Sequence, residues 1–438
     1  MAGGTFLTQN KVRPGAYINI KSAAKPLGNV SDRGTMTLAL PMDWGPSKEI
    51  ITLSNETDFA KTLGYDLLEE PLLLIKEGLK KATNMLFYRL NDGTKATKVA
   101  DNLTVTAKYA GTRGNDLTVT IAADPDVEDG YIVQTYLAAN LVDEQTAATI
   151  EDLTDNDFVT FSGTGALTAH AGIVLTGGTS SEVQVSDYSA YFAEAQHQTF
   201  NTMALTVDDP VVKGAALSFI RDFRDKEGKK AQVVLADYHQ ADYEGVISVK
   251  NGVILDSDQP LPANLATVYV AGMTAGANVN QSNTYATYEG AVAVDTKYLN
   301  SEIIELLQKG EFLFVERGDK VVVEQDINSF TGYTPNKGKA FSKNRVTRVT
   351  DGLQNDIKKI FEDYYIGKAD NNADGRNMLR AEIVHYLETL QGINAVQNFS
   401  ADDDIEVLPG EAVDAVVVNL YIQPVDSMEK LYMSVTLA

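Results

Sequence analysis

The sequence contains no cysteine, so disulfide bonds and thiolate metal sites are excluded. It has no apolar run near the roughly 20 residues of a membrane-spanning helix, and its first residues lack the pattern of a signal peptide. We therefore expect no direct membrane insertion and no export by the general secretory pathway. The metalloprotease motif HExxH, the hydrolase motif GxSxG and the phosphate-binding P-loop motif are missing as well.

The chain has fewer basic than acidic residues. The chain has 37 lysine and arginine residues against 60 aspartate and glutamate residues, which gives a formal net charge of −23. Such an excess of negative charge argues against binding to nucleic acid or to an anionic membrane. Apolar residues make up 44% of the 438 residues, which is enough for several folded cores and about three domains.

Changes in composition along the chain predict five segments. The residues between about 95 and 185 are rich in Thr, Val, Ala, Gly and Asp and show short alternating runs, which indicates an inserted all-β domain. The other segments are an N-terminal linking arm (1–28), an α/β segment of the core (29–94), an α/β domain (186–330) and a C-terminal α+β assembly domain with a terminal strand (331–438).

Apolar periodicity predicts a mixed α/β and α+β multidomain fold, in which mixed-sheet core domains carry the inserted all-β domain and terminal strand-exchanging arms. Short apolar runs predict strands at Met36–Leu40, Met85–Leu90, Ala231–Ala236 and Leu265–Gly272. Within the insert, helical spacing is limited to Gln145–Ile150.

The C-terminal block predicts two helices and a strand. The first helix covers 351–366 and starts with Asp351 as a cap, because Gln354 follows three residues later. The second covers 376–390, with apolar residues at helical spacing. The apolar run Ala415–Ile422 is typical of a strand that is buried on both sides.

Both ends of the chain carry alternating patterns that predict strands. Such a strand can lie in its own sheet or pair with the open sheet edge of another molecule, and strands at both tips suit a chain that links copies of itself. The residues of these predicted inter-subunit strands are Val12, Ala16, Tyr17, Ile18, Ile20, Leu431, Met433, Val435 and Leu437.

An enzyme is the main alternative. Asp237, His239, Asp242 and Glu244 follow the predicted strand Ala231–Ala236, and ligands often gather at the carboxyl ends of strands in α/β sheets. Carboxylates beside a histidine can hold a divalent ion or exchange protons. This cluster would define a soluble metal-dependent α/β hydrolase, although acidic loops are also expected at this net charge.

Residues 370–375 imitate the start of a calcium-binding EF-hand loop. Asp370, Asn372 and Asp374 occupy positions 1, 3 and 5, and Gly375 occupies position 6. Position 12 is Ala381, where the loop needs a glutamate. A turn between two helices explains the same residues, with Asp374 capping the second helix.

Four basic residues lie on or beside the polar faces of the two C-terminal helices. They form either a solvated helix face or a contact with an acidic partner surface. These residues are Lys358, Lys359, Arg376 and Arg380.

Six stretches, taken in order, resemble segments of the contractile tail sheath proteins of myophages and phage-tail-like particles, in the version found in phages and prophages of Gram-positive bacteria. In the family, the first of these segments is a terminal arm with a Pro-Gly turn. The second is a strand followed by a short helix, and the third is a further strand. The stretches are GTFLTQNKVRPGAYINI, ITLSNETDFAKTLG, NMLFYRL, AKYAGTRGNDLTVTI, YVAGMTAGANVNQSNTY and VVVEQDINSFTGYTP.

The resemblance implies a structural subunit with no catalytic residue, no metal and no cofactor. Subunits of this family form stacked hexameric rings around a tail tube and contract to drive the tube through the host envelope. The implied partners are the chain itself, the tube protein and the baseplate and tail terminator proteins, with no nucleic acid. The resemblance places the subunit in the tail of the particle, after synthesis in the bacterial cytoplasm. It further implies that the terminal arms add strands to neighbours, that a C-terminal helix faces the tube and that the insert lies outside.

Overall fold

The computed structural model describes residues 2–4, 15–17, 30–127 and 129–437, which divide into two compact units. The larger unit consists of Ser31–Asn355 and Pro424–Ala438, and the smaller unit consists of Met1–Val30 and Asp356–Gln423. The long helix α7 (Asn344–Tyr364) begins in the larger unit and ends in the smaller one. None of the helices in the described part of the chain combines the length and the apolar character that a membrane crossing requires.

A seven-stranded sheet forms the centre of the larger unit, in the order β21-β17-β16-β15-β3-β5-β4. Its strands pair in parallel, except that β4 runs antiparallel to β5. Helices cover both faces, which explains why the strand sequences are continuous apolar runs. The strands are β3 (Thr35–Leu40), β4 (Ile50–Leu53), β5 (Asn84–Arg89), β15 (Thr202–Ala204), β16 (Gln232–Ala236), β17 (Val246–Val249) and β21 (Glu311–Phe312).

Two apolar cores lie on the two faces of this sheet. One core joins Leu38 of the sheet with Ile75 and Val268, and the other joins Met203 with Ile220. The helices of the first face are α2 (Leu73–Leu79) and α5 (Ala263–Gly276), and those of the second are α3 (Val185–Gln196) and α4 (Pro210–Asp225).

The predicted strand Leu265–Gly272 is wrong, because these residues belong to helix α5. Every residue from 266 to 275 is buried, so the helix is apolar on all sides and its sequence has no amphipathic period. A short apolar run of this kind cannot be told from a buried strand by periodicity alone.

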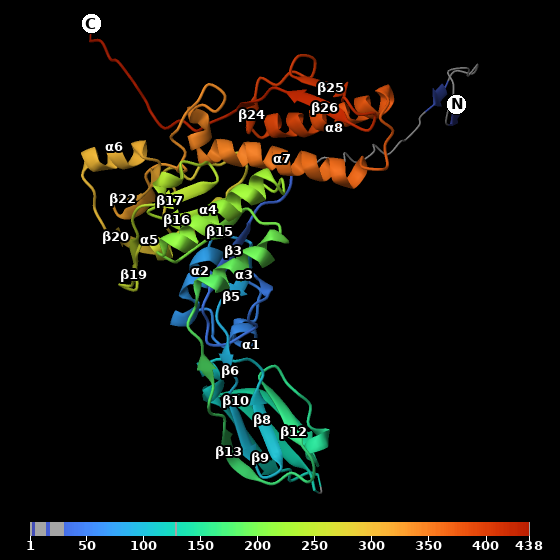
Figure 1. Cartoon of the computed structure of the whole chain (residues 1–438), viewed down its shortest axis with the longest axis vertical. Coiled ribbons are helices and arrows are strands. Elements are labelled where there is room, and N and C mark those ends of the chain that lie inside the picture. The colour runs from blue at the N-terminus through green and yellow to red at the C-terminus, as the bar shows by residue number, and fades with distance from the viewer. Residues whose placement is uncertain (1, 5–14, 18–29, 128, 438) are drawn as a thin grey trace. The chain divides into compact units, whose positions relative to one another are not determined.

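The insert is a sandwich of two sheets with the orders β11-β10-β9-β13 and β12-β8-β7 (Figure 1). Its alternating residues, among them Val105, Val119, Val133 and Val159, point into one shared core. The predicted helix at Gln145–Ile150 is wrong, because β11 pairs with β10 as far as Ala147 and only a short 3-10 turn follows. The strands are β7 (Thr97–Ala100), β8 (Leu103–Ala107), β9 (Leu117–Ala123), β10 (Tyr131–Leu137), β11 (Asn140–Ala147), β12 (Val159–Gly163) and β13 (His170–Val174).

The chain enters and leaves the insert through one antiparallel pair, β6 (Gly93–Thr94) and β14 (Thr179–Ser180). Gly93 has φ 156°, and a Cβ atom at this position would lie 1.8 Å from the carbonyl oxygen of Thr179. Only glycine allows the two backbones to approach this closely. Side chains add to this two-strand junction, since Trp44 stacks on Phe158 of the sandwich and Arg113 donates a 2.9 Å hydrogen bond to the carbonyl oxygen of Gly64.

The larger unit contains further short elements. A three-stranded sheet has the order β19-β18-β20, and β22 and β23 form an antiparallel hairpin. The elements are α1 (Phe59–Leu63), β18 (Val253–Leu255), β19 (Pro260–Leu261), β20 (Ala291–Val294), α6 (Asn300–Gln308), β22 (Phe314–Arg317) and β23 (Lys320–Val323).

The smaller unit packs the second half of α7 against α8 (Ala373–Gly392). The Tyr386 hydroxyl donates a 2.7 Å hydrogen bond to the carboxylate of Asp356, and both side chains are buried. Three short strands follow, β24 (Val396–Gln397), β25 (Ile405–Pro409) and β26 (Val416–Leu420), and β25 pairs with β26 in an antiparallel hairpin. The N-terminal strands β1 (Ala2–Gly4) and β2 (Gly15–Tyr17) pair in parallel.

Two predictions for the C-terminal block are wrong. Helix α7 begins at Asn344, so Asp351 lies inside the helix rather than at its cap. The strand predicted at Ala415–Ile422 is not buried on both sides, because Val417 and Val418 of β26 are 43% and 36% exposed. This apolar sequence is typical of a core strand, but it lies on the surface of the single chain.

Candidate functional site: assembly elements and a charged seam

Asp237 and His239 of the predicted hydrolase cluster bind different partners. The Asp237 carboxylate pairs with Lys250, whereas His239 Nδ1 lies 2.8 Å from Oε1 of Glu311. Burial raises the pKa of Glu311, although a hydrogen bond from Ser248 and the charge of His239 oppose this rise. Among the residues that the structure describes, no group of three or more histidine, aspartate or glutamate side chains is arranged to hold a metal ion.

Asp242 and Glu244 face the loop that precedes α7. Asp242 Oδ1 accepts hydrogen bonds from the backbone amides of Thr331 (2.7 Å) and Gly332 (2.8 Å). Burial alone would raise the pKa of Asp242, but these amides outweigh it and leave the pKa lowered. Glu244 Oε2 lies 2.5 Å from the Nζ atom of Lys337. Two members of the sequence cluster, Asp242 and Glu244, therefore hold this loop.

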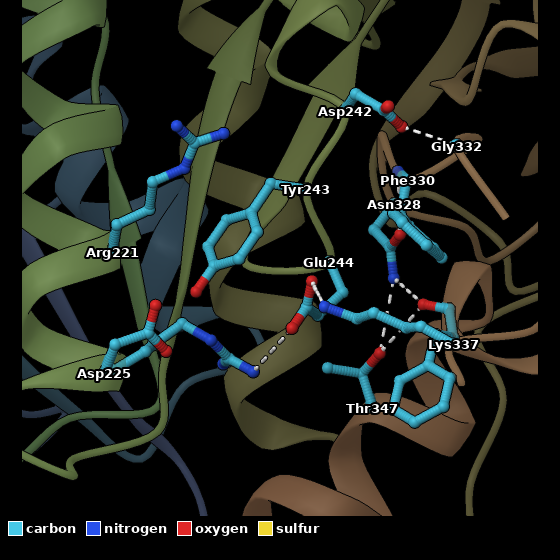
Figure 2. Close-up of polar contacts among 12 residues, drawn as sticks. Arg221, Asp225, Asp242, Tyr243, Glu244, Asn328, Phe330, Gly332, Lys337 and Thr347 are labelled. Atoms are coloured by element: carbon cyan, nitrogen blue, oxygen red, sulfur yellow. Dashed lines mark hydrogen bonds and ion pairs between the residues drawn. The ribbon is translucent and has the colours of Figure 1, made fainter. Parts of the chain in front are cut away.

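A set of buried charges continues from Glu244 to helix α7. The guanidinium of Arg224 donates two hydrogen bonds to Asp351, at 2.6 and 2.8 Å, and lies 3.8 Å from Glu244. Figure 2 shows the Glu244 carboxylate directed at Lys337, with the ring of Tyr243 alongside. We call Arg224, Tyr243, Glu244, Lys337 and Asp351 the charged seam.

Burial and charge act in opposite directions within the charged seam. Burial lowers the pKa of Arg224, but the charge and hydrogen bonds of Asp351 outweigh this and raise it. Arg224 therefore stays charged inside the protein. Burial also raises the pKa of Tyr243 to about 12, so its hydroxyl remains protonated at neutral pH.

Lys337 is surrounded by aromatic rings as well as by a carboxylate. Its Nζ atom lies 5.1 Å from the ring centroid of Phe330, 5.5 Å from that of Tyr243 and 5.7 Å from that of Phe341. An ammonium over aromatic faces within about 6 Å is attracted by the negative faces of the rings. The loop between β23 and α7 is thus fixed by electrostatic contacts.

The first half of α7, which belongs to the larger unit, makes further polar contacts with the rest of that unit. Arg348 lies 2.5 Å from Asp326, with both side chains 1% exposed, and Asn344 Nδ2 donates a 2.9 Å hydrogen bond to the same carboxylate. The amide of Asn355 exchanges two hydrogen bonds with the backbone of Lys230, at 2.8 and 2.9 Å. This half of α7 is therefore part of the larger unit's core.

Sequence reasoning missed these contacts, although a signal was present. Asn344, Arg348, Asp351 and Asn355 are spaced by four, three and four residues, which places them on one face of a helix. A polar face of this kind predicts a loop and a helix cap, because polar residues are usually exposed.

The C-terminal tail, residues 425–437, has no regular secondary structure within the single chain and runs to the C label in Figure 1. Its predicted inter-subunit residues Leu431, Met433, Val435 and Leu437 are 86%, 74%, 72% and 92% exposed. Four large apolar side chains at every second position thus lie in solvent, and their pairing with another subunit remains a prediction.

The predicted N-terminal strand is described in part. Ala16 and Tyr17 lie in β2, whose partner is the strand β1 of the same chain. Val12, Ile18 and Ile20 lie outside the described residues.

The four predicted tube-facing cations differ in their surroundings. Lys359 is exposed on α7, and Lys358 lies 3.7 Å from Glu362 one turn further on. Arg380 donates to the carbonyl oxygen of Ala401. Arg376 is half-buried, and its NH1 group donates a 3.0 Å hydrogen bond to the side chain of Asn371.

The EF-hand-like stretch is a structural turn. Asn372, rather than Asp374, caps α8, since its side chain accepts a 2.8 Å hydrogen bond from the amide of Gly375. Asn371 donates to the carbonyl oxygens of Val413 and Ala415, at 2.7 and 2.9 Å. These residues therefore join α8 to the loop between β25 and β26.

Four family models match almost the whole chain. Their descriptions are the N-terminal region of domain III of the tail sheath protein Gp18 (residues 33–90), the phage tail sheath β-sandwich domain (91–181), the central domain (181–329) and the C-terminal domain (336–438).

Individual relatives agree with these models. The chain is 37% identical to the phage-like element PBSX protein XkdK of Bacillus subtilis, over 99% of each chain. The crystal structure of the sheath tail protein of Desulfitobacterium hafniense shares 46% identity and a TM-score of 0.86, over 96% of this chain and 99% of that one. The helical sheath of the anti-feeding prophage in its contracted state has the same fold, with a TM-score of 0.58 at 12% identity over 97% of this chain and 99% of that one. These similarities support a structural sheath subunit instead of the hydrolase that we considered as the alternative, and the chain belongs to the phage tail sheath protein family.

Proposed function

We propose that this sheath protein polymerises with copies of itself into stacked hexameric rings around a tail tube and contracts to drive the tube through a host envelope. Its further partners are the tail tube protein and the baseplate and tail terminator proteins. It is synthesised and assembled in the cytoplasm of the bacterial host and then functions in the tail of the particle. The exposed alternating tail is the observation that carries this proposal.

The tail has the pattern of a strand without a sheet. Leu431, Met433, Val435 and Leu437 would all lie on one face of a strand, since successive side chains alternate. Full burial stabilises a side chain of this kind by about 1.5–3 kcal/mol. A neighbouring subunit that added the tail to its sheet edge would supply that burial and backbone hydrogen bonds together. The N-terminal arm, with Ala16 and Tyr17, has the corresponding role at the other end.

Tube contact is assigned to the C-terminal helices. Lys359 presents an exposed charge on α7, and Lys358, Arg376 and Arg380 lie on or beside the same two helices. An acidic strip on a tube surface would complement these cations. The insert, which leaves and rejoins the core through two neighbouring short strands, suits the outer side of the sheath.

The Asp237 cluster has a structural role in this proposal. Each of its side chains contacts a nearby lysine, glutamate or backbone amide of the same unit, as Asp242 does with the amide of Gly332. Replacing His239 with alanine is accordingly expected to leave assembly unchanged.

A matched pair of substitutions tests the tail. Val435→Asp places a charge among the alternating apolar residues, and Val99→Asp makes the same change at an exposed position (62%) on the insert. Both chains should fold, because neither position is buried. Sedimentation velocity should show that Val435→Asp remains unassembled where the wild type and Val99→Asp form large particles. Wild-type assembly by Val435→Asp would refute the proposed role of the tail.

A further inference from the structure

One residue of the C-terminal tail has its side chain largely buried against the rest of the larger unit. The side chain of Glu429 is only 12% exposed, whereas Met428 and Leu431 are fully or largely exposed. A carboxylate that leaves water needs compensating partners. Glu429 is therefore a specific contact in an otherwise exposed segment.

Three residues from two loops of the larger unit are the partners of Glu429. Oε2 receives the ammonium of Lys343 and a 2.5 Å hydrogen bond from Gln325, and Oε1 receives a 2.9 Å hydrogen bond from Thr284. Partial burial alone would raise the pKa of Glu429, but these partners outweigh it and leave the pKa lowered. Asp426 of the tail lies 3.9 Å from the same lysine.

The contact lies at the wall of a groove of about 750 Å³ that Ser427, Glu429 and Lys430 help to line. Leu431 and the residues after it leave this groove with their apolar side chains exposed. The tail is thus held to its own subunit mainly by charge and hydrogen bonds. Its apolar residues stay available to a partner.

We propose that Glu429 anchors the C-terminal tail to its own subunit and leaves residues 430–437 as a free arm. This inference rests on the proposed function, in which the arm pairs with a neighbouring subunit. An extended chain spans at most about 3.3–3.6 Å per residue, so the eight residues 430–437 reach about 26–29 Å. The receiving sheet edge of the neighbour must lie within that distance of the anchor.

Trypsin cleavage after Lys430 tests the anchor on dilute, unassembled protein. A protease needs several residues on each side of the bond in extended form, so an anchored Glu429 slows the cut. Glu429→Gln removes the ion pair, and Glu305→Gln makes the same change at an exposed position on α6. Mass spectrometry of the released peptide 431–438 should show cleavage about tenfold faster for Glu429→Gln and unchanged for Glu305→Gln.

Lys343→Gln tests the anchor independently. It should accelerate the cut as much as Glu429→Gln does, and the double substitution should add little, because both remove one interaction. Equal cleavage of Glu429→Gln and Glu305→Gln would overturn the anchor. Cleavage is measured before assembly, so a failure of the tail to pair with neighbours would leave this result intact and refute only the proposed function.

Discussion

At the scale of single residues, buried ion pairs decide how α7 is held. Arg224 and Asp351 are 4% and 7% exposed and bind through two parallel hydrogen bonds, which is the geometry that best offsets the loss of water. Two residues that are 127 positions apart in the sequence thereby join α4 to α7. Removing one partner leaves the other charge buried and uncompensated.

We therefore expect Arg224→Met to lower the free energy of unfolding by about 3–5 kcal/mol. The control is Lys226→Met, two residues away, where an exposed pair with Asp222 is broken and the loss should stay below about 1 kcal/mol. Urea unfolding followed by circular dichroism measures both. Similar midpoints for the two variants would show that the charged seam does not hold α7.

At the scale of elements, helix α5 illustrates what packing demands of the sequence. It crosses α2 so closely that a Cβ atom on Gly272 would lie 2.3 Å from the carbonyl oxygen of Gly78. Neither helix can move away without opening the core that both share with the central sheet. A glycine inside a helix is otherwise unfavourable.

Gly272→Ala should accordingly destabilise the protein by about 1–3 kcal/mol, because the added methyl group overpacks the crossing. Gly352→Ala is the control, since a Cβ atom there would meet Val279 at an ordinary 3.6 Å. Helix propensity should make that variant as stable as the wild type or more stable by up to about 1 kcal/mol. Thermal unfolding of the two variants tests the contrast, and a neutral Gly272→Ala would contradict the described crossing.

The same elements show where prediction from sequence succeeded. The strands at Met36–Leu40, Met85–Leu90 and Ala231–Ala236 are present in the central sheet to within a residue at each end. Their length of about five or six residues suits a strand better than a helix. The all-β insert was recognisable from its alternating residues and its lack of helical periods. The alternating residues at 431–437 form no strand within the single chain, and their pairing with a neighbouring subunit stays a prediction.

The failures have physical causes. Helix α5 is buried on every side, so it lacks the polar face that identifies a helix. The start of α7 was missed because Arg348 and Asp351 are polar residues whose partners, Asp326 and Arg224, are remote in sequence. The hydrolase alternative rested on Asp237, His239 and Asp242 being close in sequence, but in the structure they bind separate partners.

At the scale of the whole molecule, net charge opposes association. With a formal charge of −23, two subunits repel each other until salt screens them, and the screening length falls from about 30 Å at 0.01 M to about 10 Å at 0.1 M salt. Raising sodium chloride through that range should therefore accelerate assembly of the purified protein, as followed by light scattering. Sucrose at equal osmolarity is the control. An assembly rate independent of salt would contradict this role of the charge.

Electron microscopy of the purified, concentrated protein tests the central claim most directly. A sheath subunit whose tails pair between neighbours should form hollow tubes with regular striations, either alone or around the tail tube protein. Val435→Asp should form none under the same conditions. Uniform small particles of the wild type at every concentration and salt, even with the tube protein present, would contradict assembly into a sheath.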